Sequence, residues 1–258
     1  MVFAIEFITE LLSYGNSIKP FQIMKSKLKL VLISLILTSC SFLDNGERIK
    51  YHKNGKVMFV GNIKSGKRIG VWAFYDDKGF SVDSIPYEDG VKNGIAKTYS
   101  LFRGTRLSGK GNYVNGKKHG VWESYHDDGN VHSKEEFNMG IPIGIFAYYY
   151  ADGTPKILTP VQNGKWHGDH KEYYPSGDLS VTGHYHNGMR DGEWKEYYEN
   201  GLIKEIYHCQ TDLWHGNYEK YYPNGNISEK GRYELDNKTG TWEYFDTNGI
   251  VISTGKYK

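Results

Sequence analysis

The chain has 258 residues, with 32 Lys and Arg against 30 Asp and Glu and a formal net charge of +2 at pH 7. Without residues 1–39, which we interpret below as an extension and a leader, the counts fall from 32 to 28 and from 30 to 28. A neutral remainder lacks the basic surface of nucleic-acid-binding proteins, so we expect no nucleic-acid partner.

Residues 1–23 precede a segment with the form of a secretory signal. Glu6 and Glu10 are unusual in the basic start of such a signal, so we interpret 1–23 as a spurious or extra N-terminal extension. Either the start codon has been placed too early and Met24 is the true start, or the segment is a genuine amphipathic addition.

Residues 24–39 have the composition of a signal peptide. Three lysines, at 25, 27 and 29, come before an apolar run over residues 30–37 that is too short to span a membrane as a helix. The alternative interpretation is a buried or spanning helix.

The run ends in Leu-Thr-Ser-Cys, which resembles the lipobox of bacterial lipoproteins. The resemblance implies that Cys40 is diacylated and becomes the mature N-terminus, with residues 40–46 as a tether. By analogy to lipoprotein sorting, Ser41 favours the outer membrane of a Gram-negative bacterium. We therefore predict an exported protein, lipid-anchored in the cell envelope.

Residues 47–258 repeat with a period of about 24 residues. Eight glycines mark the period: Gly70, Gly94, Gly120, Gly144, Gly168, Gly192, Gly216 and Gly240. A period in this range indicates one supersecondary unit copied along the chain, each copy burying its apolar face against its neighbours. Function is then expected on a surface and not in one deep pocket.

Each copy carries two turn signals. Asn-Gly and Asp-Gly pairs supply the positive φ values of tight turns, and runs rich in Tyr, Trp, Phe, Val and Ile lie between them. We therefore predict an all-β fold, an elongated antiparallel meander of tandem 24-residue β-hairpins with about 16 strands. The copy from Gly94 to Gly120 is 26 residues long and has Ala96 in place of an aromatic residue, so we expect bulges or longer loops there.

The copies have the form aromatic-x-x-Gly-x-x-x-Gly-x-[aromatic]-x-x-Tyr-x-x-[Asn/Asp]-Gly, as in GEWKEYYENG at 192–201. This pattern resembles MORN repeats, and more closely the bacterial variant in proteins labelled YwqK-family antitoxins. The resemblance covers residues 47–258 as about eight copies with half-copies at each end. It implies a long twisted ribbon, and its label implies an antitoxin that neutralises a toxic partner.

Aromatic residues recur in two columns, which we expect on opposite faces of the sheet because side chains alternate along a strand. Such rings form either the core of a thin protein or exposed platforms for sugars or a partner's side chains. The candidate binding residues are Trp122, Trp194, Trp242, Tyr197 and Tyr221.

Signs of a catalytic, cofactor or metal site are weak in this sequence. The glycines from Gly61 to Gly66 imitate a phosphate-binding loop, but they belong to the repeat and Arg68 occupies the Ser/Thr position. Three repeat histidines, 48 residues apart, would lie about 20 Å from one another, too far for a shared metal. A patch of His167, His184 and His186 remains conceivable as ligands, while Cys209 replaces a repeat tyrosine and is expected to be packed and inert.

We therefore predict a non-enzymatic, lipid-anchored repeat scaffold that mediates protein–protein interaction at the bacterial envelope. Its expected partners are the membrane, through Cys40, and an unknown protein; no cofactor is expected, and Lys256 and Lys258 beside the last strand favour a monomer. Two alternatives remain, a YwqK-like antitoxin and a protein that binds carbohydrate or cell wall through exposed aromatic rings.

Overall fold

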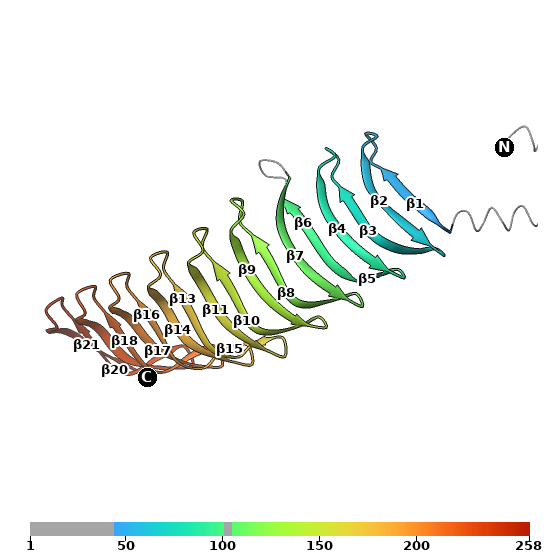
Figure 1. The fold of residues 1–258 in the computed structure, drawn as a ribbon. Helices are drawn as coiled ribbons and strands as arrows, with labels where there is room; N and C mark the ends of the chain where they lie inside the picture. Colours follow the sequence, from blue (N-terminus) through green and yellow to red (C-terminus); the bar gives the residue numbers. More distant parts are fainter. Residues whose placement is uncertain (1–43, 101–104) are drawn as a thin grey trace, which may run out of the picture.

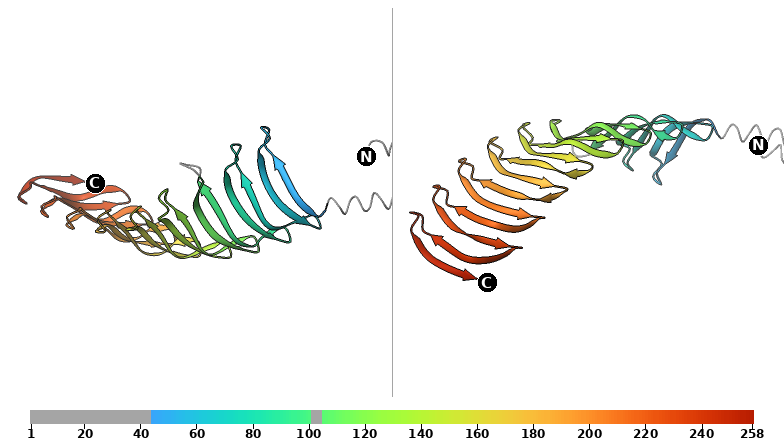
Figure 2. Two further views of the ribbon diagram at one scale, coloured as in Figure 1. Left: turned by 45° about the horizontal axis from the view of Figure 1, so that its top comes forward. Right: turned by 90° about the horizontal axis from the view of Figure 1, so that it is seen from below.

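The structure, a computed structural model, describes residues 44–100 and 105–258. These residues form one antiparallel sheet in which each long strand pairs with the next long strand along the chain, from β1 at one end to β21 at the other (Figure 1). Figure 2 shows the strands side by side in one curved layer that twists along its length. The predicted meander is confirmed.

The 21 strands have the following bounds: β1 Gly46–Tyr51, β2 Val57–Lys64, β3 Lys67–Tyr75, β4 Ser81–Glu88, β5 Val91–Lys92, β6 Gly94–Ser100, β7 Arg106–Val114, β8 Lys117–Tyr125, β9 Val131–Asn138, β10 Ile141–Tyr149, β11 Pro155–Gln162, β12 Lys165–Trp166, β13 Gly168–Tyr173, β14 Leu179–His186, β15 Met189–Arg190, β16 Gly192–Tyr197, β17 Ile203–Gln210, β18 Leu213–Tyr221, β19 Ile227–Glu234, β20 Asn237–Phe245 and β21 Val251–Tyr257.

Three of these strands, β5, β12 and β15, have two residues each and are the first pieces of interrupted strands. The interruptions fall at Asn93, His167 and Asp191. Their N–H groups donate to carbonyls seven residues earlier, at 2.9 to 3.0 Å. Joining each piece to the strand that follows leaves 18 long strands, slightly more than the predicted 16.

Two-residue turns join the strands along one edge of the sheet. The first residue has a φ near +50° and is usually followed by a glycine of positive φ, as in Asn115-Gly116 at +49° and +79°, the arrangement of a type I′ hairpin. The N–H of the second turn residue donates to a carbonyl of the preceding copy. The spacing is 22 residues in most turns, for example from Gly140 to Lys118 at 2.7 Å, and 24 residues from Gly116 to Lys92 at 2.8 Å. Each turn on this edge is therefore tied to the turn of the preceding copy.

Five-residue turns join the strands along the opposite edge. The first residue of four such turns is a tyrosine whose hydroxyl donates to a carbonyl 23 residues later, at 2.5 to 2.8 Å. We call these four residues the tyrosine clips: Tyr150, Tyr174, Tyr198 and Tyr222. His52 and His126 make the same contact through Nε2, at 3.0 and 2.9 Å, so the clip extends to copies without a tyrosine.

The 26-residue copy contains a register shift between Thr98 and Tyr99, as expected. Equivalent shifts occur in the regular copies, for example between Glu196 and Tyr197, so the bulge belongs to the repeat and is not peculiar to this copy. Residues 101–104 of this copy lie outside the described residues.

Candidate functional site

One face of the sheet, which we call the tryptophan face, carries a packed aromatic layer. Trp72, Trp194 and Trp242 are 3%, 3% and 0% exposed. Each ring lies against a glycine of the preceding long strand, and a Cβ built on that glycine would fall 2.2 to 2.3 Å from the indole. The expectation of exposed platforms is wrong for Trp194 and Trp242, because flat contact with glycine buries both rings.

A cation covers the opposite side of each indole. Its charged group lies 4.4 Å from the ring centroid for Arg68 over Trp72, 5.8 Å for Arg190 over Trp194 and 3.7 Å for Lys238 over Trp242. Each cation is four residues before its tryptophan. In two copies the central position holds a residue other than tryptophan, and a tryptophan stands four residues before it, where the other copies have the cation. Trp214, for example, stacks on Tyr218 with ring centroids 5.5 Å apart.

The two candidate tyrosines are half-buried. Tyr221 donates a hydrogen bond to Glu219, and burial followed by this bond raises the pKa of Tyr221 to about 12. The backbone carbonyls of Tyr197 and Tyr221 accept the tyrosine clips from Tyr174 and Tyr198. Both residues therefore take part in the repeat contacts that hold neighbouring copies together.

Trp122 differs from Trp72, Trp194 and Trp242 because it is only partly buried. It lies against Gly111 and under Lys118, whose Nζ is 4.5 Å from the ring centroid. Beside it, however, a row of small residues replaces the large side chains found in other copies. Thr98 pairs with Gly109, Gly109 with Ser124, and Ser124 with Ser133, across β6 to β9.

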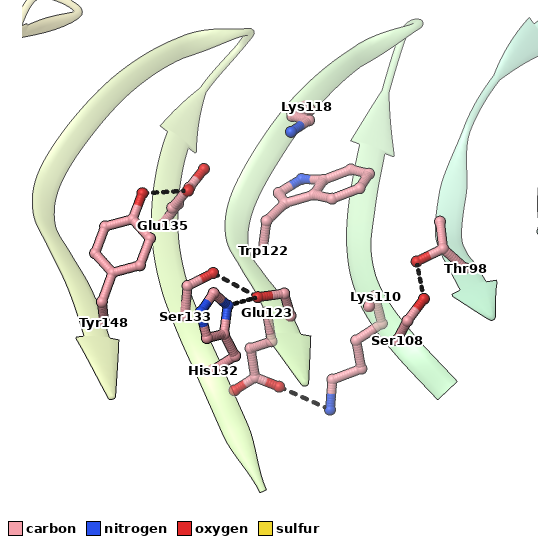
Figure 3. A pocket seen from close by; sticks show the side chains of 12 residues that line it. Thr98, Ser108, Lys110, Lys118, Trp122, Glu123, His132, Ser133, Glu135 and Tyr148 are labelled. Carbon is pink, nitrogen blue, oxygen red and sulfur yellow. Dashed lines mark hydrogen bonds and ion pairs between the residues drawn. The ribbon is translucent and has the colours of Figure 1, made fainter. Parts of the chain in front are cut away.

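The small-residue row leaves a hollow of about 410 Å³ (Figure 3). Directly paired residues of antiparallel strands share a face, so the row continues to Asp83 on one side and to Tyr148 on the other. Phe59 and Phe74 occupy the same row near the N-terminal end of the sheet. The hollow therefore exists because four consecutive positions of this row lack bulky side chains.

Hydroxyl groups line the hollow and bond to one another. Ser108 Oγ donates to Thr98 Oγ1 at 3.2 Å, and Ser124 Oγ lies 2.7 Å from Ser133 Oγ. Ser124 Oγ also lies 3.1 Å from His132 Nδ1. Figure 3 shows these groups on adjacent strands around the space below Trp122.

The remaining wall contains a tyrosine, a carboxylate and an ammonium group. Tyr148 Oη donates to Glu135 at 3.1 Å, and burial together with the Glu135 charge raises the pKa of Tyr148. Lys118 supplies the cation, whereas the Glu123–Lys110 pair at 3.0 Å lies on the opposite face, because Glu123 directly follows Trp122. Burial, and then the nearby His126 and Lys156, lower the pKa of His132, so its ring is neutral at pH 7.

The contact between Ser124 and His132 does not form a nucleophilic triad. A triad needs a carboxylate hydrogen-bonded to the imidazole nitrogen that faces away from the serine. Among residues 44–100 and 105–258, the hydrogen bonds of His132 include none to a carboxylate. The arrangement is suited to hydrogen bonding with a ligand.

The remaining candidates from the sequence are the histidine patch, Cys209 and the N-terminal segments with Cys40. Within the described part of the chain, no group of three or more His, Cys, Asp or Glu side chains is placed to hold a metal ion. Cys209 is 3% exposed, as expected for a packed residue, and burial raises the pKa of its thiol. Cys40, the extension at 1–23 and the signal peptide at 24–39 lie outside the described residues. No helix of the described segments is long and apolar enough to cross a membrane.

In a comparison with known protein families, the chain matches the MORN repeat variant. The matched segments are residues 44–65, 118–139, 166–187, 190–209, 214–234 and 238–258. No curated protein matches the chain.

Solved structures that match include a mutant of S. aureus TarM in complex with fondaparinux, alpha-GlcNAc-glycerol and UDP. The identity is 15% and the TM-score 0.28, over 54% of this chain and 23% of that one. A second match is the TcdB2-TccC3-Cdc42 structure, with 13% identity and a TM-score of 0.21 over 78% of this chain and 13% of that one. The chain thus spans less than a quarter of either solved chain.

Proposed function

We propose that this chain, an array of MORN repeats of the variant type, is a non-enzymatic scaffold that binds a partner protein at the bacterial envelope. The repeats and the unclosed sheet make the chain a repeat scaffold. The lipid on Cys40, the outer-membrane location and the protein partner are the further parts of the proposal.

The observation that carries the proposal is an apolar stripe on the face opposite the tryptophans. Val71, Ile95, Val121 and Ile145 are 60%, 63%, 52% and 57% exposed. Each directly precedes the central residue of its copy and so points to the other face. We call these four residues the back-face stripe.

The back-face stripe is confined to four successive copies. The same position in the next four copies holds Asp169, Glu193, Asn217 and Thr241, which are polar. Successive members are two strands apart, about 10 Å, and their cross-strand partners on the same face are Pro86, Asn112, Glu136 and Pro160. The stripe therefore presents β-branched side chains at regular intervals along the sheet. Grouped exposed apolar residues mark protein–protein interaction sites in soluble proteins, which favours a partner that docks along this half of the sheet.

The partner is tested by crosslinking on membranes and recovery of the full chain. Val121→Thr combined with Ile145→Thr keeps β-branched side chains but removes apolar surface, and should reduce recovery of a stoichiometric partner at least about tenfold. Thr241→Ser, at the same position outside the back-face stripe, is the matched control and should leave recovery unchanged. Equal recovery with both variants would overturn the assignment of the stripe.

The identity of the recovered partner separates the scaffold from the antitoxin alternative. A toxic enzyme that loses its activity on binding would establish the YwqK-like function, whereas a non-toxic envelope protein supports the scaffold.

The anchor is tested separately by metabolic labelling with palmitate. Label that disappears in Cys40→Ser supports lipidation, and unlabelled wild-type protein in the soluble fraction would refute it.

A further inference from the structure

We infer that the hollow beside Trp122 is a binding site for a neutral sugar ring of a glycan. This inference does not rest on the lipid anchor or on the back-face stripe, since the hollow lies on the tryptophan face and is formed by other residues.

The first observation is that one of the four tryptophans that lie against a glycine is less buried than the other three. Four copies place a tryptophan between a glycine and a cation, and three of these rings are at most 3% exposed. Trp122 alone among the four is half-buried, because Gly109, Ser124 and Ser133 leave its flank open. A ligand in the hollow would restore the contacts that bulky side chains supply elsewhere.

The second step is the supply of hydrogen-bonding groups. A hydroxyl carries one donor and two acceptor sites. When Ser108 donates to Thr98, the hydroxyl proton of Thr98 and acceptor sites on both oxygens can still bond to a ligand. The Ser124–Ser133 pair uses one proton between its members, and the contact with His132 Nδ1 takes either the second proton or one acceptor site of Ser124, so acceptor sites remain on both oxygens. Paired hydroxyls with spare capacity match the hydroxyl groups of a sugar, each of which both donates and accepts.

The third step is charge. The side chains on this face supply one ammonium group, of Lys118, and one carboxylate, of Glu135, while His132 is neutral at pH 7. The charges balance, so the hollow offers no net attraction to a phosphate or to a free cation. The binding of a neutral ligand does not depend on such an attraction.

The fourth step is size and apolar surface. The volume of about 410 Å³ falls at the lower end of small-molecule sites, about 300 to 1,000 Å³. Tyr148 and the open edge of Trp122, whose ring faces lie against Gly111 and Lys118, supply apolar walls on two sides, which suit the C–H surface of a pyranose. The same space would accept a partner's tyrosine side chain, but its single hydroxyl would meet few of the polar groups. The lining therefore favours the polyhydroxylated ligand.

The experiment measures binding of soluble trisaccharides to the purified full chain. The probes are chitotriose, cellotriose, maltotriose and a soluble muropeptide, each titrated to about 10 mM and followed by calorimetry and tryptophan fluorescence. At least one probe should bind saturably and change the tryptophan emission of the chain. No binding by any of the four probes would overturn the inference.

Two variants locate the binding. Ser124→Leu fills the hollow and removes a hydroxyl, and should weaken binding at least about tenfold. Ser253→Leu is the matched control, because Ser253 lies in the same row at the last strand, paired with Tyr244, and should bind like the wild type. Equal binding by wild type and Ser124→Leu would place the sugar elsewhere and refute the site.

A third variant guards against misfolding of Ser124→Leu. Glu135→Gln keeps the size of the side chain and the acceptor for Tyr148, but removes a charge. It should change the affinity for the bound sugar about two- to tenfold while leaving the thermal midpoint close to wild type; an unchanged affinity contradicts a role for this wall. N-acetyl-tyrosinamide binding without any sugar binding would identify a side-chain pocket instead, and would also overturn the inference.

Discussion

Replacing Gly231 by alanine tests the contact that buries the tryptophans. A Cβ at Gly231 would lie 2.2 Å from Cδ2 and Cε2 of Trp242, far inside ordinary van der Waals contact. The indole is 0% exposed and cannot swing into solvent. Overpacking of this kind costs about 1 to 3 kcal/mol, against a gain of roughly 0.5 to 1 kcal/mol when alanine replaces a strand glycine. Because the approach is this close and the ring cannot move, the cost falls in the upper half of its range, and we expect the free energy of unfolding to fall by about 1 to 2.5 kcal/mol.

The assay must report on local opening, because repeat arrays unfold from their ends and not always as one unit. Urea unfolding followed by tryptophan fluorescence gives the overall change. Hydrogen exchange of the amides in β19 and β20 shows whether the loss is local. Gly255→Ala is the matched control: its Cβ would meet Tyr257 Cε2 at 3.0 Å, and Tyr257 is 41% exposed and can move away.

A double-mutant cycle identifies the cause. In a Trp242→Leu background the clash is relieved, so Gly231→Ala should become neutral or stabilising, with a coupling energy of about 1 to 2 kcal/mol. If Gly231→Ala is as stable as wild type, or if its cost is the same with leucine at 242, the argument for the glycine contact is refuted.

Three other predictions follow from contacts between and within copies. Tyr198→Phe removes the 2.6 Å bond to the Tyr221 carbonyl, and should cost about 0.5 to 1.5 kcal/mol and speed hydrogen exchange in the turn after Tyr221; unchanged exchange would contradict the clip. The pKa of Glu123 is lowered from 4.5, first by the hydrogen bond from Tyr125 and then by the hydrogen bond from Lys110. The stabilisation that Glu123 gives to the folded state is therefore present above about pH 4.5 and is lost as the pH falls through the lowered pKa. Glu123→Gln should therefore flatten this part of the acid-unfolding curve, and an identical curve would argue against the pairing. In a Cys40→Ser chain, burial should make Cys209 react with a thiol reagent at pH 8 only as fast as the native protein opens, and fully in urea; rapid native labelling would contradict its packing.

The turns and the strand composition could be predicted because both are local properties. Asn115-Gly116 carries its own preference for positive φ, whatever the rest of the chain does. The three strand interruptions were not foreseen, since His119 and His215, at the same position of other copies as His167, lie within continuous strands. The interruptions depend on a carbonyl of the neighbouring strand that accepts the N–H groups of Asn93, His167 and Asp191.

Burial of the tryptophans had a sequence signal that the two-column interpretation missed. A glycine stands eleven residues before each of four tryptophans, in the pairs Gly61 and Trp72, Gly111 and Trp122, Gly183 and Trp194, and Gly231 and Trp242. Copies with another residue at the tryptophan position lack that glycine, as with Thr159 and His170. The co-occurrence indicates a flat ring that needs a residue without a side chain beside it.

The hollow could not be predicted from these patterns. Thr98, Gly109, Ser124 and Ser133 are unremarkable small residues, spread over 36 positions of the chain. Only the register across β6 to β9 brings them into one row. A count of small residues in the 26-residue copy would have drawn attention to the region without showing the cavity.

The connections between copies run in opposite directions along the two edges of the sheet. A tyrosine clip reaches forward by 23 residues, and a two-residue turn reaches back by 22. A unit with a tyrosine or histidine clip therefore brings a link to the unit after it and a link to the unit before it. Recombination that removed or duplicated one whole unit would join matching links at the new boundary, so the array can change length during evolution without any side chain being redesigned.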